Sequence, residues 1–212
     1  MRGHHSQPVI VLPRLYAIAD AAGFSTTEDL ITFAKQLTAG GCTLLQYRNK
    51  SGNAAAMFRQ ALALKMNTVG DVKLIMNDRA DLCLAAQFHG VHVGQEDLSA
   101  AAVRKIIGAD LWLGVSTHNP EQVQEADLTS ADYLAIGPVF ATSSKDRPDP
   151  VVGLEGVRRA RQLTRKPLVA IGGITRANAA SVIEAGADSV AVISDLLTNP
   201  RKSAEEFFRI LR

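Results

Sequence analysis

The sequence is poor in cysteine, in aromatic residues and in long apolar runs. Its 212 residues include two cysteines and 5% aromatic residues, which excludes a small domain held together by disulfides. The apolar runs are no longer than a strand and fall far short of the roughly 20 residues that cross a bilayer. The net charge of +2 provides no basic surface for nucleic acid. We therefore expect neither a membrane partner nor a nucleic-acid partner.

Both cysteines, Cys42 and Cys83, lie in apolar stretches. Buried free thiols of this kind are typical of a reducing compartment, and residues 1–8 lack the apolar segment of a secretory signal. These features predict a cytoplasmic protein. With 47% hydrophobic and 21% charged residues, we expect one globular domain over residues 9–212 and a flexible N-terminal tail over residues 1–8.

Eight short apolar runs alternate with amphipathic segments along the chain. The runs are near-continuous, as in parallel strands that are buried on both faces. We expect strands at Leu15–Asp20, Cys42–Arg48, Lys73–Asn77, Gly90–Val93, Leu111–Ser116, Tyr133–Val139, Pro167–Gly172 and Ser189–Ser194. We expect helices at Thr27–Ala39, Asn53–Val69, Arg79–Ala86, Ser99–Ile107, Pro120–Ala126, Leu154–Leu163, Arg176–Ala185 and Pro200–Leu211. Eight such units predict an α/β protein with a single-domain (β/α)8 TIM barrel, in preference to a doubly wound open sheet of about five or six strands.

Polar residues gather just after the predicted strands, at the end where such barrels assemble their active sites. Gly172-Gly173 follows the seventh strand, and Ile193-Ser194 ends the eighth. Glycine lets backbone N–H groups approach an anion, and the loops after strands seven and eight of these barrels often bind a phosphate. The residues therefore predict a phosphate site, although a simple tight turn would also use paired glycines.

Two carboxylates, Asp78 and Asp97, end the third and fourth strands. Neighbouring places on the rim could bring them together, and two carboxylates with phosphate oxygens and water form an oxygen site that suits Mg²⁺. Helix capping would explain either aspartate alone, because each one also precedes a helical segment. The presence of both, beside Asn77 and Gln95, favours a metal site.

Gln46, Arg48 and Lys50 alternate along the end of the second strand, so their side chains point to one side. The two cations would neutralise a diphosphate, and the Arg fork could hold two of its oxygens. A charge inside the barrel, paired with a neighbouring aspartate, is the structural alternative.

The longest stretch without regular structure, residues 140–153, carries Thr142, Ser143, Ser144 and Lys145. A loop of this length in a compact domain is often a lid over the site. Lys145 could then swing in towards a bound diphosphate, although a single loop lysine is more often only a solvated charge.

Ser116 ends the fifth strand and His118 follows two residues later. No nucleophile elbow surrounds this serine, so we interpret Ser116 as a hydrogen-bond donor to a bound group. His118 is the best acid or base candidate on the rim, but a structural role fits it better. We expect His89 and His92 to be packing residues.

Seven strings in this order resemble the thiamine phosphate synthase family. They span the chain from the second strand to the eighth, and together they are far more specific than any one alone. The strings are Gln46-Tyr-Arg-Asn-Lys50, Asn77-Asp78-Arg79-Ala80-Asp81, Gly90-Val-His-Val-Gly-Gln-Glu-Asp97-Leu98, Gly114-Val-Ser116-Thr-His118, Gly137-Pro-Val-Phe-Ala-Thr142-Ser-Ser144-Lys145, Ile171-Gly-Gly173-Ile174 and Val192-Ile193-Ser194. One departure is Ser144, where such sequences frequently have a threonine.

The resemblance implies a role for each matching residue. The pyrimidine diphosphate would be held by Gln46, Tyr47, Arg48, Asn49, Lys50, Asn77, Ser116 and Lys145. Asp78 and Asp97 would hold Mg²⁺. The thiazole phosphate would be held by Thr142, Ser143, Ser144, Gly173, Ile193 and Ser194. Ser116, Lys145 and Arg48 would be the catalytic residues.

The resemblance also implies the reaction. An aminopyrimidine methyl diphosphate would lose pyrophosphate, and the thiazole phosphate nitrogen would take its methylene carbon to give thiamine phosphate. Because the aminopyrimidine ring can delocalise positive charge, we expect a dissociative substitution assisted by Mg²⁺. A homodimer is plausible only by analogy with this fold.

Three other functions stay open at the level of sequence. The first is the related thiazole tautomerase, for which His118 would be the acid or base. The second is another phosphate-binding barrel enzyme, which would leave the pair Asp78 and Asp97 unexplained. The third is a non-catalytic relative that binds a thiamine precursor. The complete set of charged rim residues favours the synthase over all three.

Overall fold

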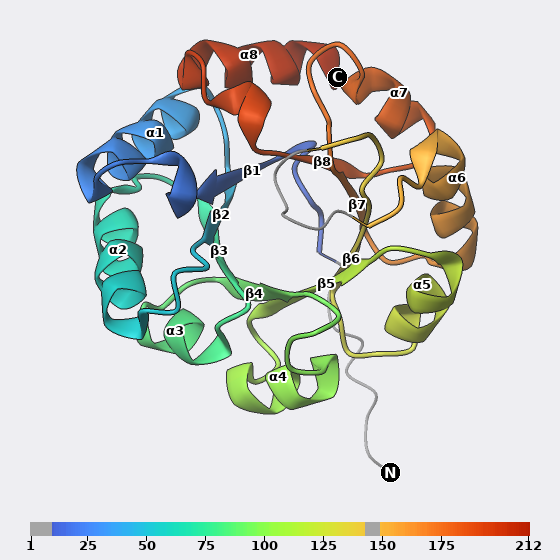
Figure 1. Ribbon diagram of the computed structural model, residues 1–212, viewed down its shortest axis with the longest axis horizontal. Helices are drawn as coiled ribbons and strands as arrows, with labels where there is room; N and C mark the ends of the chain where they lie inside the picture. Colours follow the sequence, from blue (N-terminus) through green and yellow to red (C-terminus); the bar gives the residue numbers. More distant parts are fainter. Residues whose placement is uncertain (1–9, 143–148) are drawn as a thin grey trace.

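Eight parallel strands form a closed barrel inside a ring of helices in the computed structural model, which describes residues 10–142 and 149–212 (Figure 1). The strands are β1 (Leu15–Asp20), β2 (Leu44–Arg48), β3 (Lys73–Asn77), β4 (Gly90–Val93), β5 (Trp112–Thr117), β6 (Tyr133–Ile136), β7 (Leu168–Ile171) and β8 (Ser189–Val192). The helices are α1 (Thr27–Ala39), α2 (Ala54–Asn67), α3 (Ala80–Ala85), α4 (Ala100–Ile107), α5 (Pro120–Asp127), α6 (Gly153–Leu163), α7 (Ala179–Glu184) and α8 (Pro200–Ile210), with short 3₁₀ turns η1 (Ala21–Gly23) and η2 (Ser194–Leu196).

The predicted barrel is confirmed. Each strand pairs with its sequence neighbours, and β1 pairs with β8 to close the ring. Three strands, β1, β3 and β4, have the predicted bounds, and the others are shorter by one to three residues or shifted by one. The strand β6 ends at Ile136 because Gly137 is followed by Pro138, which has no N–H to donate. The predicted tail at residues 1–8 lies outside the described residues.

Local sequence signals explain where several helices begin. Thr26 and Asp29 form a capping box at the start of α1, in which each side chain accepts a hydrogen bond from the other's backbone N–H. The helix α5 begins with Pro120, and the Asn119 side chain accepts from Gln122 N at 2.8 Å.

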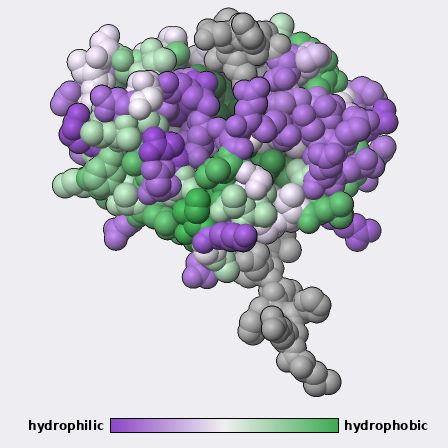
Figure 2. Space-filling model, turned by 60° about the horizontal axis from the view of Figure 1, so that its bottom comes forward, coloured by the Kyte–Doolittle hydropathy of each residue, from purple (hydrophilic) through white to green (hydrophobic). Residues whose placement is uncertain are grey.

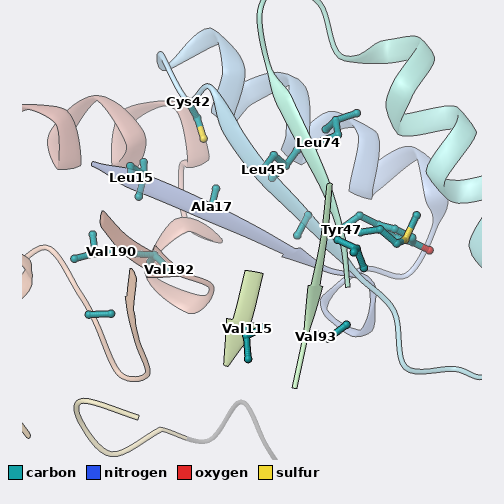
Figure 3. Packing of buried hydrophobic residues seen from close by; sticks show 14 of the residues in the cluster. Leu15, Ala17, Cys42, Leu45, Tyr47, Leu74, Val93, Val115, Val190 and Val192 are labelled. Carbon is teal, nitrogen blue, oxygen red and sulfur yellow. The ribbon is translucent and has the colours of Figure 1, made fainter. Parts of the chain in front are cut away.

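Alternation along the strands divides the hydrophobic core into two layers. One layer fills the space between the strands and the helices, and in Figure 3 Leu15, Ala17, Leu45 and Tyr47 point into it. The other fills the barrel interior and includes Tyr16, Ile18, Leu44, Ile75, Tyr133, Ala135, Val169 and Ala191. Because successive side chains point to opposite faces, a residue's position in its strand decides which layer it enters.

Two similar charged clusters tie the N-terminal ends of the strands together. Arg104 of α4 donates to Asp132 Oδ2 at 2.7 Å and to Leu111 O at 2.7 Å, while Asp132 Oδ2 also accepts from Leu113 N at 2.7 Å. These contacts join β5 to β6.

Arg161 of α6 repeats the pattern beneath β7 and β8. It donates to Asp188 Oδ2 at 2.9 Å, and Asp188 Oδ2 accepts from Leu168 N at 2.8 Å. In each cluster a helix arginine and a loop aspartate satisfy backbone groups at the strand ends, which would otherwise stay unpaired.

Hydrophilic and hydrophobic residues occupy different parts of one face of the molecule. Figure 2 shows one face on which hydrophilic residues cover much of the upper part, with smaller groups of hydrophobic residues beneath them. Within residues 10–142 and 149–212 no helix is long and apolar enough to cross a membrane. Cys42 and Cys83 are free and buried, as predicted, and burial raises the pKa of the Cys42 thiol to about 11.

The Arg104 cluster predicts a specific loss of stability. Arg104→Met should lower the free energy of unfolding by about 3 kcal/mol, because it leaves the buried Asp132 carboxylate without its cation. Arg158→Met is the matched control: its pair with Glu155 has side-chain exposures of 52% and 83%, so the loss should stay below about 1 kcal/mol. Urea unfolding followed by circular dichroism measures both, and equal losses would contradict the assigned role of Arg104.

Candidate active site

A cavity opens at the C-terminal ends of the strands, where the sequence places the site. Its floor is apolar and includes Ile18, Ala135, Val169 and Ala191. The predicted site residues that line it are Gln46, Arg48, Asn77, Ser116, Thr142, Gly173, Ile193 and Ser194. They come from β2, β3, β5 and the segments that follow β6, β7 and β8, so the closed sheet brings together residues nearly 150 positions apart.

Two predicted residues of β2 and the loop after it point away from this cavity. Tyr47 is fully buried in the outer layer, and its hydroxyl donates to Gln60 Oε1 at 2.6 Å on α2 (Figure 3). The Asn49 side chain donates to the same oxygen at 2.8 Å. The prediction that these two side chains contact substrate is corrected: both turn towards α2, and Tyr47 alternates with Gln46 and Arg48, which line the cavity.

The cation at the end of β2 and the one just after it each form an ion pair with an aspartate. Arg48 is paired with Asp20 at the end of β1, and Lys50 is paired with Asp78 at the end of β3. The Lys50 side chain is 54% exposed, whereas those of Arg48 and Asp20 are 21% and 14% exposed. Arg48 is therefore held firmly at the cavity wall, while Lys50 lies at the rim and can exchange partners.

Asp78 and Asp97 lie close together at the rim, as predicted. Burial raises the pKa of Asp78, the ion pair with Lys50 opposes this, and the neighbouring Asp97 raises the pKa further. Asp97 Oδ2 accepts from Gly94 N at 2.8 Å, while Ser99 caps α4. Neither aspartate caps a helix, so the capping alternative is not needed.

Two carboxylates supply too few ligands for a metal ion that is held by the protein alone. Among residues 10–142 and 149–212 no cluster of three or more His, Cys, Asp or Glu could hold an ion. A pair of carboxylates open to the rim does suit Mg²⁺, which usually keeps waters and takes substrate phosphate oxygens as further ligands. The donors present therefore fit that ion when a phosphorylated substrate is bound.

The paired glycines after β7 are required by the backbone. Gly172 and Gly173 have φ angles of 100° and 63°, which residues with a side chain rarely adopt. A Cβ atom at Gly173 would lie 2.5 Å from Ala141 O. The turn therefore packs against the segment after β6, and it lines the cavity beside Ile193 and Ser194.

Asn77 carries a buried polar group that lacks a partner. Its side chain is 8% exposed and lines the cavity, and within the described residues its Nδ2 has no hydrogen-bond acceptor. A buried donor without an acceptor costs about 1–3 kcal/mol. An acceptor on a ligand would remove this cost.

Sequence reasoning missed His92, which it assigned to packing. His92 Nε2 lies 2.8 Å from Ser116 Oγ, and its ring lines the cavity. His89 does fill the packing role: its Nδ1 accepts from Leu74 N at 3.0 Å. The alternation of side chains along a strand could have distinguished the two histidines, because residues an odd number of positions apart point to opposite faces. His92, which pairs in register with Gly114 of β5, faces the cavity.

Other predicted residues have mixed outcomes. His118 lines the cavity, but its Nδ1 is bound to Gly137 O at 2.6 Å and its backbone N–H donates to Gln122, which agrees with a structural role. Ser143, Ser144 and Lys145 lie outside the described residues, as does the rest of the segment 143–148 within the loop that we predicted to be a lid.

Comparison with known proteins gives one consistent family. The family model described as "Thiamine monophosphate synthase" matches residues 15–196. A thiamine-phosphate synthase of Koribacter versatilis is 61% identical over 203 residues, which cover 94% of this chain and 96% of that protein. One of Chloroflexus aurantiacus is 44% identical and covers 85% and 83%. The solved thiamine phosphate pyrophosphorylase of Pyrococcus furiosus has a TM-score of 0.83 at 32% identity, covering 93% and 95%.

The two rim carboxylates predict a measurable coupling. Asp97→Asn should lower the pKa of Asp78, because it removes the neighbouring negative charge. NMR titration of the Asp78 carboxyl in metal-free protein measures this shift. Since a raised folded pKa means that the folded chain binds the proton more tightly, the contribution of Asp78 to stability falls as the pH rises through that pKa. The substitution should weaken this pH dependence.

The matched control is Asp71→Asn, which removes an exposed charge at the opposite end of β3. It should leave the pKa of Asp78 unchanged. An Asp78 pKa that responds equally to both substitutions would mean that the Asp97 carboxylate is not its close neighbour.

Proposed function

The chain belongs to the thiamine monophosphate synthase family, and we propose from this that its barrel mouth acts as a thiamine-phosphate synthase. The methylene carbon of the aminopyrimidine diphosphate is transferred to the ring nitrogen of the thiazole phosphate. The C–O bond to the diphosphate breaks, a C–N bond forms, and pyrophosphate leaves with thiamine phosphate as the product.

One observation carries this proposal beyond family membership. The carboxylates of Asp78 and Asp97 lie together at the rim, Lys50 is paired with Asp78, and Arg48 lines the cavity. This combination of two metal-binding oxygens and two cations suits a leaving group with several negative charges. A barrel that bound only a monophosphate would need no such set.

Asp78 and Asp97 would hold Mg²⁺ on the diphosphate. When bound, the ion would act as a Lewis acid that stabilises the charge on the departing pyrophosphate. Lys50 would then leave its ion pair with Asp78 and turn towards the diphosphate oxygens. Its exposed position at the rim allows this exchange.

The pyrimidine is proposed to bind in the deeper part of the cavity. The cavity offers about 130 Å³, close to the roughly 150 Å³ of a cavity that takes one benzene ring. Gln46, Asn77 and Ser116 line this space and can offer it polar groups. The unpartnered Nδ2 of Asn77 would donate to the pyrimidine diphosphate.

The thiazole phosphate is proposed to bind on the other side of the mouth. Thr142, Gly173, Ile193 and Ser194 line that wall, and the glycine turn can offer backbone N–H groups to a phosphate. Ser143, Ser144 and Lys145 would complete the two substrate sites by resemblance.

The residues favour a dissociative path. Arg48, fixed by Asp20, and Lys50 stabilise the negative charge that develops on the leaving oxygen. The two walls hold the thiazole nitrogen in line with the pyrimidine methylene, which supplies the proximity contribution. No side chain needs to form a covalent bond with substrate.

The compartment and the oligomeric state stay predictions. The buried free thiols support the cytoplasm as the compartment, and a homodimer is proposed only by analogy with the fold. The thiazole tautomerase remains the alternative activity, and it would require His118 as acid or base.

The proposed function predicts a product that depends on Mg²⁺. The purified chain, mixed with the pyrimidine diphosphate, the thiazole phosphate and Mg²⁺, should form thiamine phosphate and pyrophosphate, and EDTA should stop the reaction. Product analysis by chromatography measures both. Asp97→Asn should remove most of the activity while the chain still folds, with Asp71→Asn as the charge-matched control. Absence of product with Mg²⁺ present, or equal product after chelation, would overturn the proposal.

A dissociative path predicts that a substituent on the pyrimidine ring changes the reaction rate. A pyrimidine diphosphate with an electron-withdrawing group on the ring should react much more slowly, because positive charge at the methylene is then less stable. Single-turnover kinetics at saturating substrate measures the chemical step. An unchanged rate would rule out early ionisation.

A further inference from the structure

A chain of hydrogen bonds crosses the barrel interior beneath the cavity. Gln46 Nε2 donates to Tyr16 Oη at 2.8 Å, and Tyr16 Oη lies 3.0 Å from Tyr133 Oη. Tyr133 Oη lies 3.1 Å from His92 Nδ1, and His92 Nε2 lies 2.8 Å from Ser116 Oγ. The five side chains come from five different strands, and all of them except Tyr133 line the cavity.

The interior is shaped around this chain. A Cβ atom at Gly114 would overlap both the Tyr133 ring and His92 Nδ1. The absence of a side chain at this position of β5 is therefore what lets the tyrosine and the histidine meet. The rings of Tyr16 and Tyr133 also meet edge to face, with centroids 6.1 Å apart.

Each hydroxyl has one proton, so a chain of bonds that all point the same way runs either from Gln46 to Ser116 or from Ser116 to Gln46. If Tyr133 accepted from both Tyr16 and His92, its own buried proton would have no acceptor among the described residues. Burial raises the pKa values of Tyr16 and Tyr133, so both stay protonated. If Gln46 Nε2 donates to Tyr16, the Tyr16 proton goes to Tyr133 and the Tyr133 proton goes to His92 Nδ1. His92 then carries its own proton on Nε2 and donates it to Ser116 Oγ.

The reverse direction leaves a buried proton without an acceptor. In that case Tyr133 would donate to Tyr16, which already accepts from Gln46. The Tyr16 hydroxyl, in a residue that is 1% exposed, contacts only Gln46 and Tyr133 among the described residues, so its proton would have no partner. The direction from Gln46 to Ser116 leaves only the Ser116 hydroxyl proton without an acceptor among the described residues, and this proton faces the cavity.

We propose that this chain makes Ser116 a directed hydrogen-bond donor to the substrate, with Tyr133 and His92 as positioning residues. Because the Ser116 oxygen already accepts from His92, its own proton must point into the cavity. There it meets an acceptor of the pyrimidine diphosphate. In the reverse direction the same oxygen would present only lone pairs, which suit an anionic substrate poorly. The identity of that acceptor rests on the proposed function, whereas the direction of the chain does not.

The direction is measured without any substrate. In the full-length protein labelled with ¹⁵N-histidine, two-bond ¹H–¹⁵N NMR spectra distinguish the nitrogen that carries the proton, and His92→Asn identifies the His92 signals. We expect a neutral ring with its proton on Nε2. A proton on Nδ1, or on both nitrogens at neutral pH, overturns the proposal whether or not the chain is a synthase.

Kinetics tests whether Tyr133 acts through Ser116. Tyr133→Phe keeps the ring and removes the donor to His92, so kcat should fall about tenfold while KM changes little. Ser116→Ala added to Tyr133→Phe should cost little more than Ser116→Ala alone, because both remove the same directed bond. Losses that multiply independently would mean that Tyr133 is only structural, and they would overturn the proposal.

Tyr47→Phe is the matched control. It removes the hydroxyl of another fully buried tyrosine, whose partner Gln60 lies outside the barrel, and it should leave kcat unchanged. Tyr16→Phe provides a second variant should Tyr133→Phe fold poorly: it leaves His92 Nδ1 as the only acceptor in the chain for the Tyr133 proton, so the proton on His92 Nε2 and the value of kcat should both be kept. A proton on His92 Nδ1 in a folded Tyr16→Phe protein counts against the proposal.

Discussion

In the closed ring of eight parallel strands, each strand side chain points either into the barrel interior or outward to the helices. Both the core and the candidate site depend on this alternation. Leu45 and Tyr47 face the helices and stabilise the fold, while Gln46 and Arg48 face the interior and form the site. The pairing of β1 with β8 leaves no free edge. A shift of one residue in any strand would therefore exchange core residues for site residues.

Most of the fold could be read from the sequence, because eight apolar runs with polar ends leave few alternatives. The clearest strands, such as β3, were predicted to the residue, whereas β6 was drawn too long because apolar residues continue past Gly137-Pro138. Helix starts were clear where a capping side chain and a proline coincide, as at Asn119 and Pro120.

The residues of the candidate site were predicted less completely than the fold. Family resemblance pointed to Asn77, Ser116 and Gly173, which line the cavity, but a matching string ignores the direction of each side chain, and so Tyr47 and Asn49 were included. His92 could have been found by alternation. The contact between Tyr16 and Tyr133, which are 117 residues apart, could not, because it depends on the stagger of β1 against β6, and a single sequence does not contain that information.

The two arginine clusters beneath the barrel have a consequence for how such a protein can evolve. The Arg104 cluster joins β5 to β6, and the Arg161 cluster joins β7 to β8, both at the end of the barrel opposite the cavity. Substitutions in the loops around the mouth therefore need not weaken the contacts that keep the strands together. New specificities can arise on an inherited barrel, because selection can alter one end of each strand while the other end preserves the fold.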